Sequence, residues 1–154
     1  MGKKTTSPFS KEQLMPQAEM LEIKRKKGDL FIGVPKESYT QEKRVCLTPD
    51  AVAAITAHGH RVIVESGAGL GSNFSDIEYS ESGAKIAFDP KEAFECNIVL
   101  KVGPPSYEEI EMMCPQSALF STLQLKTQTK KYFESLAKKR ISAVAFDFIR
   151  DEQG

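Results

Sequence analysis

From Leu30 onward, short runs of apolar and β-branched residues alternate with segments that carry helix start and stop signals. The six runs are Leu30–Val34, Arg61–Glu65, Lys85–Phe88, Asn97–Val102, Ala118–Ser121 and Ile141–Phe146. Most are nearly continuously apolar, as buried parallel strands are, and the alternation is typical of βαβ units. The pattern therefore predicts a doubly wound α/β fold with a mostly parallel sheet and flanking helices, whose ligands bind outside the carboxyl ends of the strands.

Helix signals fill the gaps between these runs. Thr48 is a capping residue before Pro49, so we expect a helix over Ala51–His58 that Gly59 ends. Capping boxes, an Asp-Pro start and an amphipathic pattern predict further helices at Ser75–Glu78, Ser106–Glu109, Asp89–Pro90 and Thr129–Arg140.

Residues 1–29 differ from the rest because they are polar and carry no strand pattern. Ser10 and Gln13 match a capping box, and Gly28 suits the position just past a helix end. We expect a helical extension over residues 1–29 and one α/β domain over residues 30–150.

Composition excludes several classes of protein. The chain of 154 residues has 21 basic and 21 acidic residues, so it has no basic excess for a nucleic-acid backbone. No apolar run approaches the ~20 residues that a membrane helix needs, so no direct membrane insertion is expected. Three widely spaced cysteines, Cys46, Cys96 and Cys114, form no CxxC pair, which argues against a disulfide framework or a metal site and favours a reduced, cytoplasmic compartment.

Three residues that follow predicted strands are candidates for binding a ligand. Arg44 ends a long charged loop and leads into the apolar Val45–Leu47, so we expect it to be partly buried, where a substrate carboxylate is a natural bidentate partner. Lys101 lies at the end of a buried strand, where its ammonium must reach either solvent or an anion. Gln124 follows the run Ala118–Ser121.

Two other motifs have simpler interpretations. The glycine-rich stretch Ser66–Ser72 lacks the sixth-position glycine and the apolar helix of a dinucleotide fingerprint, so we interpret it as a turn with positive φ. His58 and His60 flank Gly59 at a predicted helix end, and we expect them to interact with the last carbonyls rather than to bind metal or take part in catalysis.

A specific family resemblance rests on several ungapped blocks that occur in order between Leu30 and Asp147. They are IGVPKE at Ile32–Glu37, EKRVCLTP at Glu42–Pro49, GHRV at Gly59–Val62, ESGAG at Glu65–Gly69 and LKV at Leu100–Val102. These blocks resemble the N-terminal domain of alanine dehydrogenase and of the alpha subunit of NAD(P) transhydrogenase. The resemblance implies a Rossmann-like substrate domain followed in the chain by a separate dinucleotide domain.

The resemblance carries over to individual residues. The family arginine that binds the substrate carboxylate corresponds to Arg44. Gly103 stands where typical alanine dehydrogenases have a substrate-binding lysine, and Gln124 stands where they have a histidine proposed to assist proton transfer. Because glutamine cannot shuttle a proton near pH 7, no catalytic residue is secure. We hypothesise that Lys101, two residues before Gly103, reaches the same substrate anion.

The resemblance thus implies the substrate-domain part of an NAD-dependent alanine dehydrogenase, which interconverts L-alanine and pyruvate. NAD or NADP would be bound mainly by a downstream domain that we expect to be absent from this chain, so the chain alone should be inactive. The complete enzyme is expected to be a homo-oligomer. One alternative is the alpha subunit of a proton-translocating transhydrogenase with a beta-subunit partner, and another is a non-catalytic module that binds small carboxylates.

Overall fold

The computed structural model describes residues 28–38 and 41–149. Within these residues the chain forms a six-stranded sheet of order β3-β2-β1-β4-β5-β6, and every neighbouring pair is parallel. The strands are β1 (Phe31–Val34), β2 (Arg61–Glu65), β3 (Lys85–Ala87), β4 (Ile98–Leu100), β5 (Ala118–Ser121) and β6 (Ser142–Ala145). The predicted doubly wound α/β fold is confirmed, and β2 and β5 have the predicted bounds.

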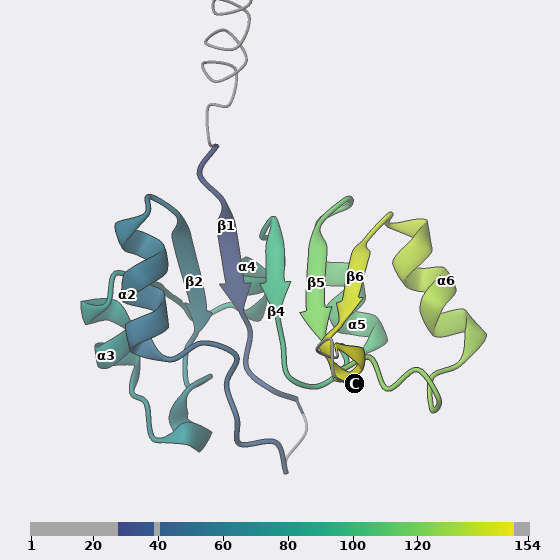
Figure 1. Ribbon diagram of the computed structural model, residues 1–154, viewed down its shortest axis with the longest axis horizontal. Coiled ribbons are helices and arrows are strands. Elements are labelled where there is room, and N and C mark those ends of the chain that lie inside the picture. Colours follow the sequence, from purple (N-terminus) through teal and green to yellow (C-terminus); the bar gives the residue numbers. More distant parts are fainter. Residues whose placement is uncertain (1–27, 39–40, 150–154) are drawn as a thin grey trace, which may run out of the picture.

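Helices connect the strands on both faces of the sheet (Figure 1). They are α2 (Pro49–Ala57), α3 (Asp76–Glu81), α4 (Pro90–Phe94), α5 (Tyr107–Met112) and α6 (Lys130–Lys138), with short 3-10 turns η1 (Leu70–Ser72) and η2 (Phe146–Phe148). Capping side chains explain where these helices begin. A first-turn N–H group of each helix donates a hydrogen bond to the side chain of its N-cap residue, which is Thr48, Ser75, Asp89, Ser106 or Thr129.

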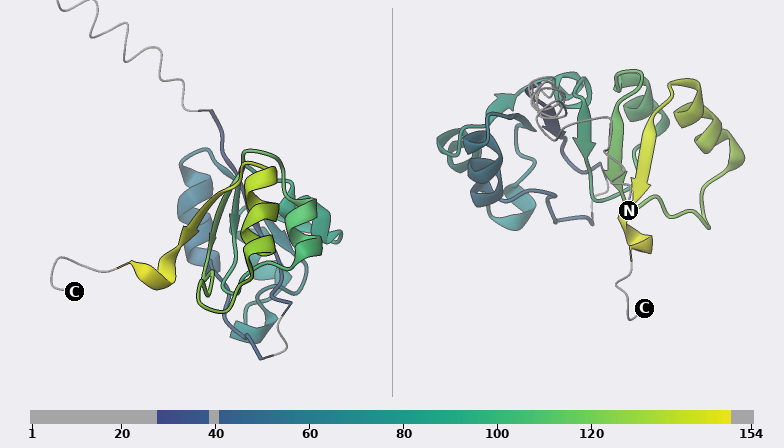
Figure 2. Two further views of the ribbon diagram at one scale, coloured as in Figure 1. Left: turned by 90° about the vertical axis from the view of Figure 1, so that its right-hand side faces the viewer. Right: turned by 45° about the horizontal axis from the view of Figure 1, so that its top comes forward.

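Two separate cores lie on opposite faces of the sheet. One lies beneath α2 and α3 and includes Val34, Val52 and Tyr79. The other lies beneath α4, α5 and α6 and includes Leu119 and Leu136. The side view in Figure 2 shows α5 and α6 on one side of the sheet and α2 on the other.

The edge strand β6 is less buried than the sequence suggests. The run Ile141–Phe146 is one of six predicted strands, most of which have the apolar pattern of buried strands, but Ser142–Val144 are exposed at the edge of the sheet, where β6 pairs with β5 alone. Leu100, Phe120 and Val144 lie in register across β4, β5 and β6. No described helix lies over the face of β4–β6 that carries these three residues (Figure 1).

The N-terminal prediction falls largely outside the structure. Residues 1–27 of the expected helical extension lie outside the described residues, and Gly28 and Asp29 belong to no helix.

Candidate functional site

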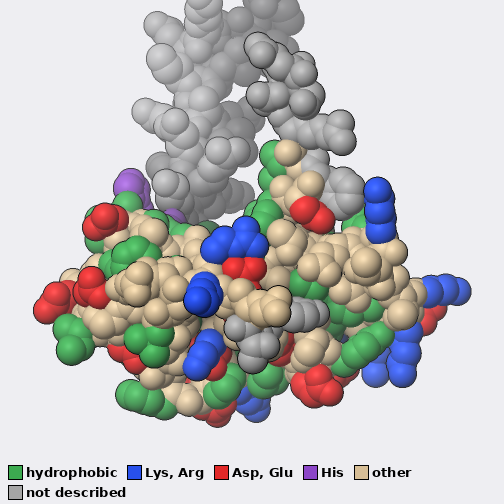
Figure 3. Space-filling view, turned by 90° about the horizontal axis from the view of Figure 1, so that it is seen from below, with side chains coloured by type: hydrophobic (Ala, Val, Ile, Leu, Met, Phe, Trp, Pro, Cys, Tyr) green, Lys and Arg blue, Asp and Glu red, His purple; other side chains and the backbone are tan. Residues whose placement is uncertain are grey.

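The candidate site lies at the carboxyl ends of the strands. The helix connections reverse direction between β1 and β4, which is the switch point where open α/β sheets bind ligands. The loop after β1, the turn after β2 and the segments after β4 and β5 meet at this edge, and Figure 3 shows this face with basic and acidic side chains side by side near its middle.

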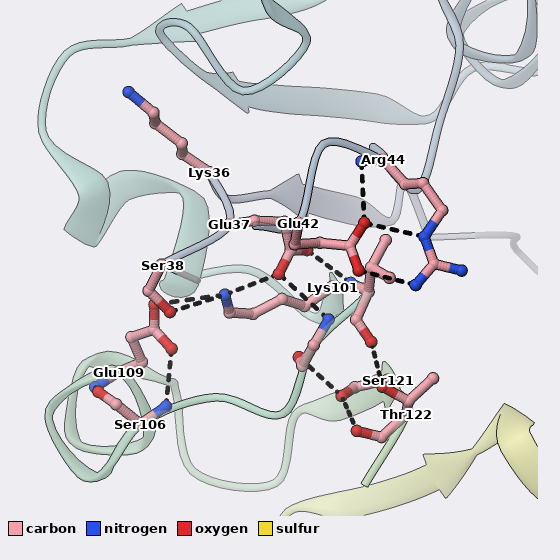
Figure 4. Close-up of polar contacts among 12 residues, drawn as sticks. Lys36, Glu37, Ser38, Glu42, Arg44, Lys101, Ser106, Glu109, Ser121 and Thr122 are labelled. Atoms are coloured by element: carbon pink, nitrogen blue, oxygen red, sulfur yellow. Dashed lines mark hydrogen bonds and ion pairs between the residues drawn. The ribbon is translucent and has the colours of Figure 1, made fainter. Parts of the chain in front are cut away.

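Arg44 holds a neighbouring carboxylate in a bidentate grip. Its Nε donates to Glu42 Oε1 at 2.8 Å and its Nη2 donates to Glu42 Oε2 at 2.7 Å (Figure 4). These hydrogen bonds lower the pKa of Glu42 to about 2. The expectation of a partly buried arginine is wrong, because 74% of the Arg44 side chain is exposed. Its acceptor in this structure is Glu42, on the same loop.

Two cavities share Arg44 and Glu42. The larger, of about 420 Å³, extends to Lys36, Lys43 and the glycine-rich turn at Gly67. The smaller, of about 240 Å³, is lined by Gln41, Gly103, Thr122 and Gln124 as well as by the shared pair. The structure thus brings Arg44, Gly103 and Gln124 around one cavity, although they lie on three different connections.

Gln124 has an unusual backbone conformation. Its φ is 49°, in the left-handed region, and its carbonyl oxygen accepts hydrogen bonds from the N–H and hydroxyl groups of Thr127, both at 2.9 Å. The exposed side chain lines the smaller cavity and also a third cavity of about 310 Å³ that reaches Asp147. An amide that can both donate and accept thus lines the same cavity as Arg44.

Lys101 lies beneath these cavities rather than in them. Its side chain is 0% exposed, and its Nζ is 3.1 Å from Glu37 Oε2, 3.3 Å from Ser38 Oγ and 3.5 Å from Glu109 Oε1. Of the two outcomes that the sequence left open, solvent or an anion, the structure thus places the ammonium on protein carboxylates.

Glu37 is a residue that the sequence reasoning missed. Besides contacting Lys101, its carboxylate accepts from the backbone N–H groups of Val102 at 2.6 Å and of Gly103 at 3.1 Å. A signal was present: β1 and β4 are adjacent, so an acidic residue just past β1 could have been matched to a lysine just past β4.

The glycine-rich stretch is a turn, as predicted. Gly67 has a φ of 76°, and its N–H donates to Asp76 Oδ1 at 2.8 Å. The N–H groups of Ser66, Ala68 and Leu70 donate to backbone carbonyls. These groups therefore do not form a phosphate cradle.

The two histidines behave differently from each other. His58 Nδ1 lies 2.7 Å from the carbonyl oxygen of Ala54 at the end of α2, as expected. The same prediction for His60 is wrong, because its Nδ1 lies 3.4 Å from the N–H of Leu30 and accepts from it instead.

Among residues 28–38 and 41–149 no cluster of three potential metal ligands occurs, and no helix is long and apolar enough to cross a membrane.

Two of the three cysteines, Cys46 and Cys96, are unsuited to nucleophilic chemistry. Burial raises the pKa of the Cys46 thiol to about 12 and that of the Cys96 thiol to about 11. Both groups are therefore protonated near neutral pH, as a packing role requires.

A parallel sheet with polar cavities at its switch point defines a doubly wound α/β domain, with its cavities at the edge where such folds bind their ligands. Residues 33–154 match the family model described as "Alanine dehydrogenase/PNT, N-terminal domain". The chain belongs to this family, which confirms the resemblance seen in its sequence blocks.

Individual relatives agree with the family match. The alanine dehydrogenase of Bacillus subtilis strain 168 is 38% identical over 122 residues, which cover 79% of this chain and 32% of that protein. A solved L-alanine dehydrogenase superposes with a TM-score of 0.76 at 33% identity and covers 80% of this chain and 34% of its own. The transhydrogenase from Sinorhizobium meliloti superposes with a TM-score of 0.73 at 27% identity, and the match covers 80% of this chain and 37% of that one. The chain thus spans about a third of the length of the relatives it matches.

Proposed function

We propose that this chain is the substrate-domain part of an NAD-dependent alanine dehydrogenase, which converts L-alanine, NAD and water to pyruvate, ammonia and NADH. The observation that carries the proposal is the smaller cavity, where Arg44, Gly103 and Gln124 meet at the positions that match the substrate-binding residues of the family. Arg44 would exchange Glu42 for the substrate carboxylate, which offers the same two-oxygen fork.

The proposal assigns Gln124 to the reacting end of the substrate. An amide can donate to the keto oxygen of pyruvate or accept from the amino group of alanine, but it cannot exchange a proton near pH 7. Proton transfer in the complete enzyme must then come from another group or from water.

The glycine-rich turn is a poor match for a dinucleotide site. Its N–H groups at Ser66, Gly67, Ala68 and Leu70 already have acceptors within the protein, so these four are not available to a pyrophosphate. We therefore assign NAD or NADP to a part of the complete protein outside these residues, and we propose a homo-oligomeric, cytoplasmic enzyme.

The alpha subunit of a proton-translocating NAD(P) transhydrogenase is the second candidate. Gly103 and Gln124 favour it, because an enzyme that exchanges hydride between two nucleotides needs neither the lysine nor the histidine of an amino-acid site. The similarity to the Sinorhizobium meliloti transhydrogenase supports it as well.

A kinetic test uses the protein encoded by the complete reading frame. We expect NADH oxidation that depends on both pyruvate and ammonium, and we expect Arg44→Ala to raise the KM for pyruvate by about 10- to 100-fold, since hydrogen bonds to a charged group are lost. Arg61→Ala is the matched control, because Arg61 begins β2 and so lies at the amino ends of the strands, opposite the candidate site.

The outcome separates the candidates. A rate equal to that without pyruvate removes the dehydrogenase, and hydride exchange between two nucleotides in the presence of a beta subunit then identifies the transhydrogenase. Carboxylate binding that depends on Arg44 without any redox activity identifies a non-catalytic binding module.

A further inference from the structure

We propose that Glu37, held in place by the buried Lys101, is a positioning residue that fixes the Gly103 wall of the smaller cavity. What that wall does for a substrate rests on the proposed function, whereas its mechanical support follows from the contacts themselves. Lys101 thereby acts through Glu37 and not by touching the substrate.

The hydrogen bonds of Glu37 converge on three consecutive residues. Oε2 lies 3.1 Å from both Lys101 Nζ and the N–H of Gly103, and Oε1 accepts from the N–H of Val102 at 2.6 Å. Only 7% of the Glu37 side chain is exposed, so water cannot readily replace these partners. One carboxylate thus satisfies two backbone donors and one cation at the end of β4 (Figure 4).

Protein groups surround the Lys101 ammonium. It donates hydrogen bonds to Glu37 and Ser38 and forms an ion pair with Glu109 Oε1 at 3.5 Å, and its side chain is 0% exposed. A fully buried cation is stable only with such partners, and breaking the pair would leave an uncompensated charge. A substrate anion would have to displace Glu37 or Glu109 to reach it.

Both peptide groups that form the wall are held in place. While the Gly103 N–H donates to Glu37, the Gly103 carbonyl accepts from Ser121 Oγ at 3.0 Å. The Val102 carbonyl accepts from Thr122 Oγ1 at 2.6 Å. The N–H groups of Val102 and Gly103 are thus already paired, so recognition falls to the side chains that line the cavity, among them Arg44 and Gln124.

Glu37 also links the two sides of the cavity. It lies on the same connection as Arg44, between β1 and α2, and it grips the segment that carries Gly103 after β4. Its hydrogen bonds therefore attach the connection that carries Arg44 to the Gly103 side of the cavity.

Amide hydrogen exchange of the 154-residue chain tests this support directly. The N–H groups of Val102 and Gly103 donate to different oxygens of Glu37, and Glu37→Gln replaces one of these oxygens by an NH2 group, so one of the two N–H groups loses its partner. We expect its exchange to accelerate by about tenfold or more relative to the wild type. Unchanged exchange at both positions in folded Glu37→Gln overturns the proposal.

Glu109→Gln is the matched control. It removes the same charge from beside the same ammonium, but Glu109 contacts neither of the two N–H groups. Exchange at Val102 and Gly103 should stay within about twofold of the wild type in this variant. If Glu37→Gln fails to fold, the double variant Glu37→Gln/Lys101→Met removes both charges together and supports the same measurement without an orphaned buried cation.

Kinetics of the complete protein give the second readout. We expect Glu37→Gln to raise the KM for pyruvate about tenfold while the KM for NADH is unchanged, a split that general destabilisation would not produce. An equal rise in both KM values overturns the positioning role. Absence of pyruvate turnover in the wild type defeats the proposed function alone, because hydrogen exchange still decides what Glu37 does.

Discussion

At the scale of single residues, backbone strain distinguishes Gln124 from the groups around it. Its φ of 49° is a conformation that residues with a Cβ adopt at a cost of roughly 1–2 kcal/mol. Gln116 has a similar φ of 65°, but it precedes β5 where Gln124 follows it, and it lines neither of the cavities at Arg44. The two glutamines therefore share the strain but not the surroundings.

This pair allows strain and function to be measured separately. We expect Gln124→Gly and Gln116→Gly each to raise the free energy of unfolding by about 0.5–1 kcal/mol, because glycine adopts a positive φ without steric cost. Only Gln124→Gly should also raise the KM for pyruvate. Urea unfolding and steady-state kinetics check both expectations, and a KM equally raised in Gln116→Gly would show that Gln124 has no special place in the site.

Which site residues could be predicted depends on how far apart their partners lie in sequence. Arg44 and Gln124 were found because each follows a strand, and parallel strands end at one edge of the sheet. Glu37 was missed because its partner Lys101 lies 64 residues away, and no local pattern links them. The bidentate pair of Arg44 with Glu42 was missed as well, because the apolar residues after Arg44 do not reveal it.

At the scale of elements, local chemistry predicted starts better than ends. Ser75 and Ser106 begin α3 and α5 with capping boxes, as the sequence indicated. The predicted strand Asn97–Val102 is reduced to Ile98–Leu100. Backbone hydrogen bonds to the β5 segment continue as far as the Val102 carbonyl, but Glu37, just past β1, accepts from the N–H groups of Val102 and Gly103. Tertiary contacts of this kind decide where an apolar run stops being a strand.

The capping box of α3 yields a stability prediction. Ser75 Oγ accepts from the N–H of Glu78 at 3.3 Å, and Glu78 Oε2 accepts from the N–H of Ser75 at 2.7 Å. We expect Ser75→Ala to lower the free energy of unfolding by about 1 kcal/mol, as loss of an N-cap does. Ser80→Ala, an exposed position later in the same helix, is the control and should be neutral or slightly stabilising.

Denaturant titration of Ser75→Ala and Ser80→Ala measures the free energy of unfolding of each variant. Equal stability of Ser75→Ala and the wild type would mean that water replaces the cap without cost. The exposed Ser80 shows how much of any change comes from helix propensity alone.

At the scale of the whole molecule, the two cores share one sheet. The core under α2 and α3 and the core under α4, α5 and α6 lie on opposite faces, and the pairing of β1 with β4 joins the two halves of the sheet. That pairing joins Ile32 to Ile98 and Gly33 to Val99. Such a narrow junction raises the question whether the two halves unfold together.

Gly33 makes the junction tight. A Cβ at this position would lie 1.7 Å from the carbonyl oxygen of Ala93, so α4 packs directly on the backbone of β1. Since α4 also contributes Phe94 to the core around Leu119, it belongs to both halves. The contact favours a single cooperative transition, as is usual for domains of this size.

Leu119→Ala tests that cooperativity. Leu119 is fully buried in the core beneath α4, α5 and α6, so the change should cost about 2–5 kcal/mol. If the molecule unfolds as one unit, the slowest amides of β2 should then exchange roughly 30-fold faster or more, and by the same factor as those of β4, although β2 lies in the other half of the sheet. Val144→Ala on the exposed edge strand is the control and should change neither rate by more than about twofold. Faster exchange confined to β4 and β5 would mean that the two halves open independently, and that the Arg44 side of the candidate site can persist while the Gly103 side unfolds.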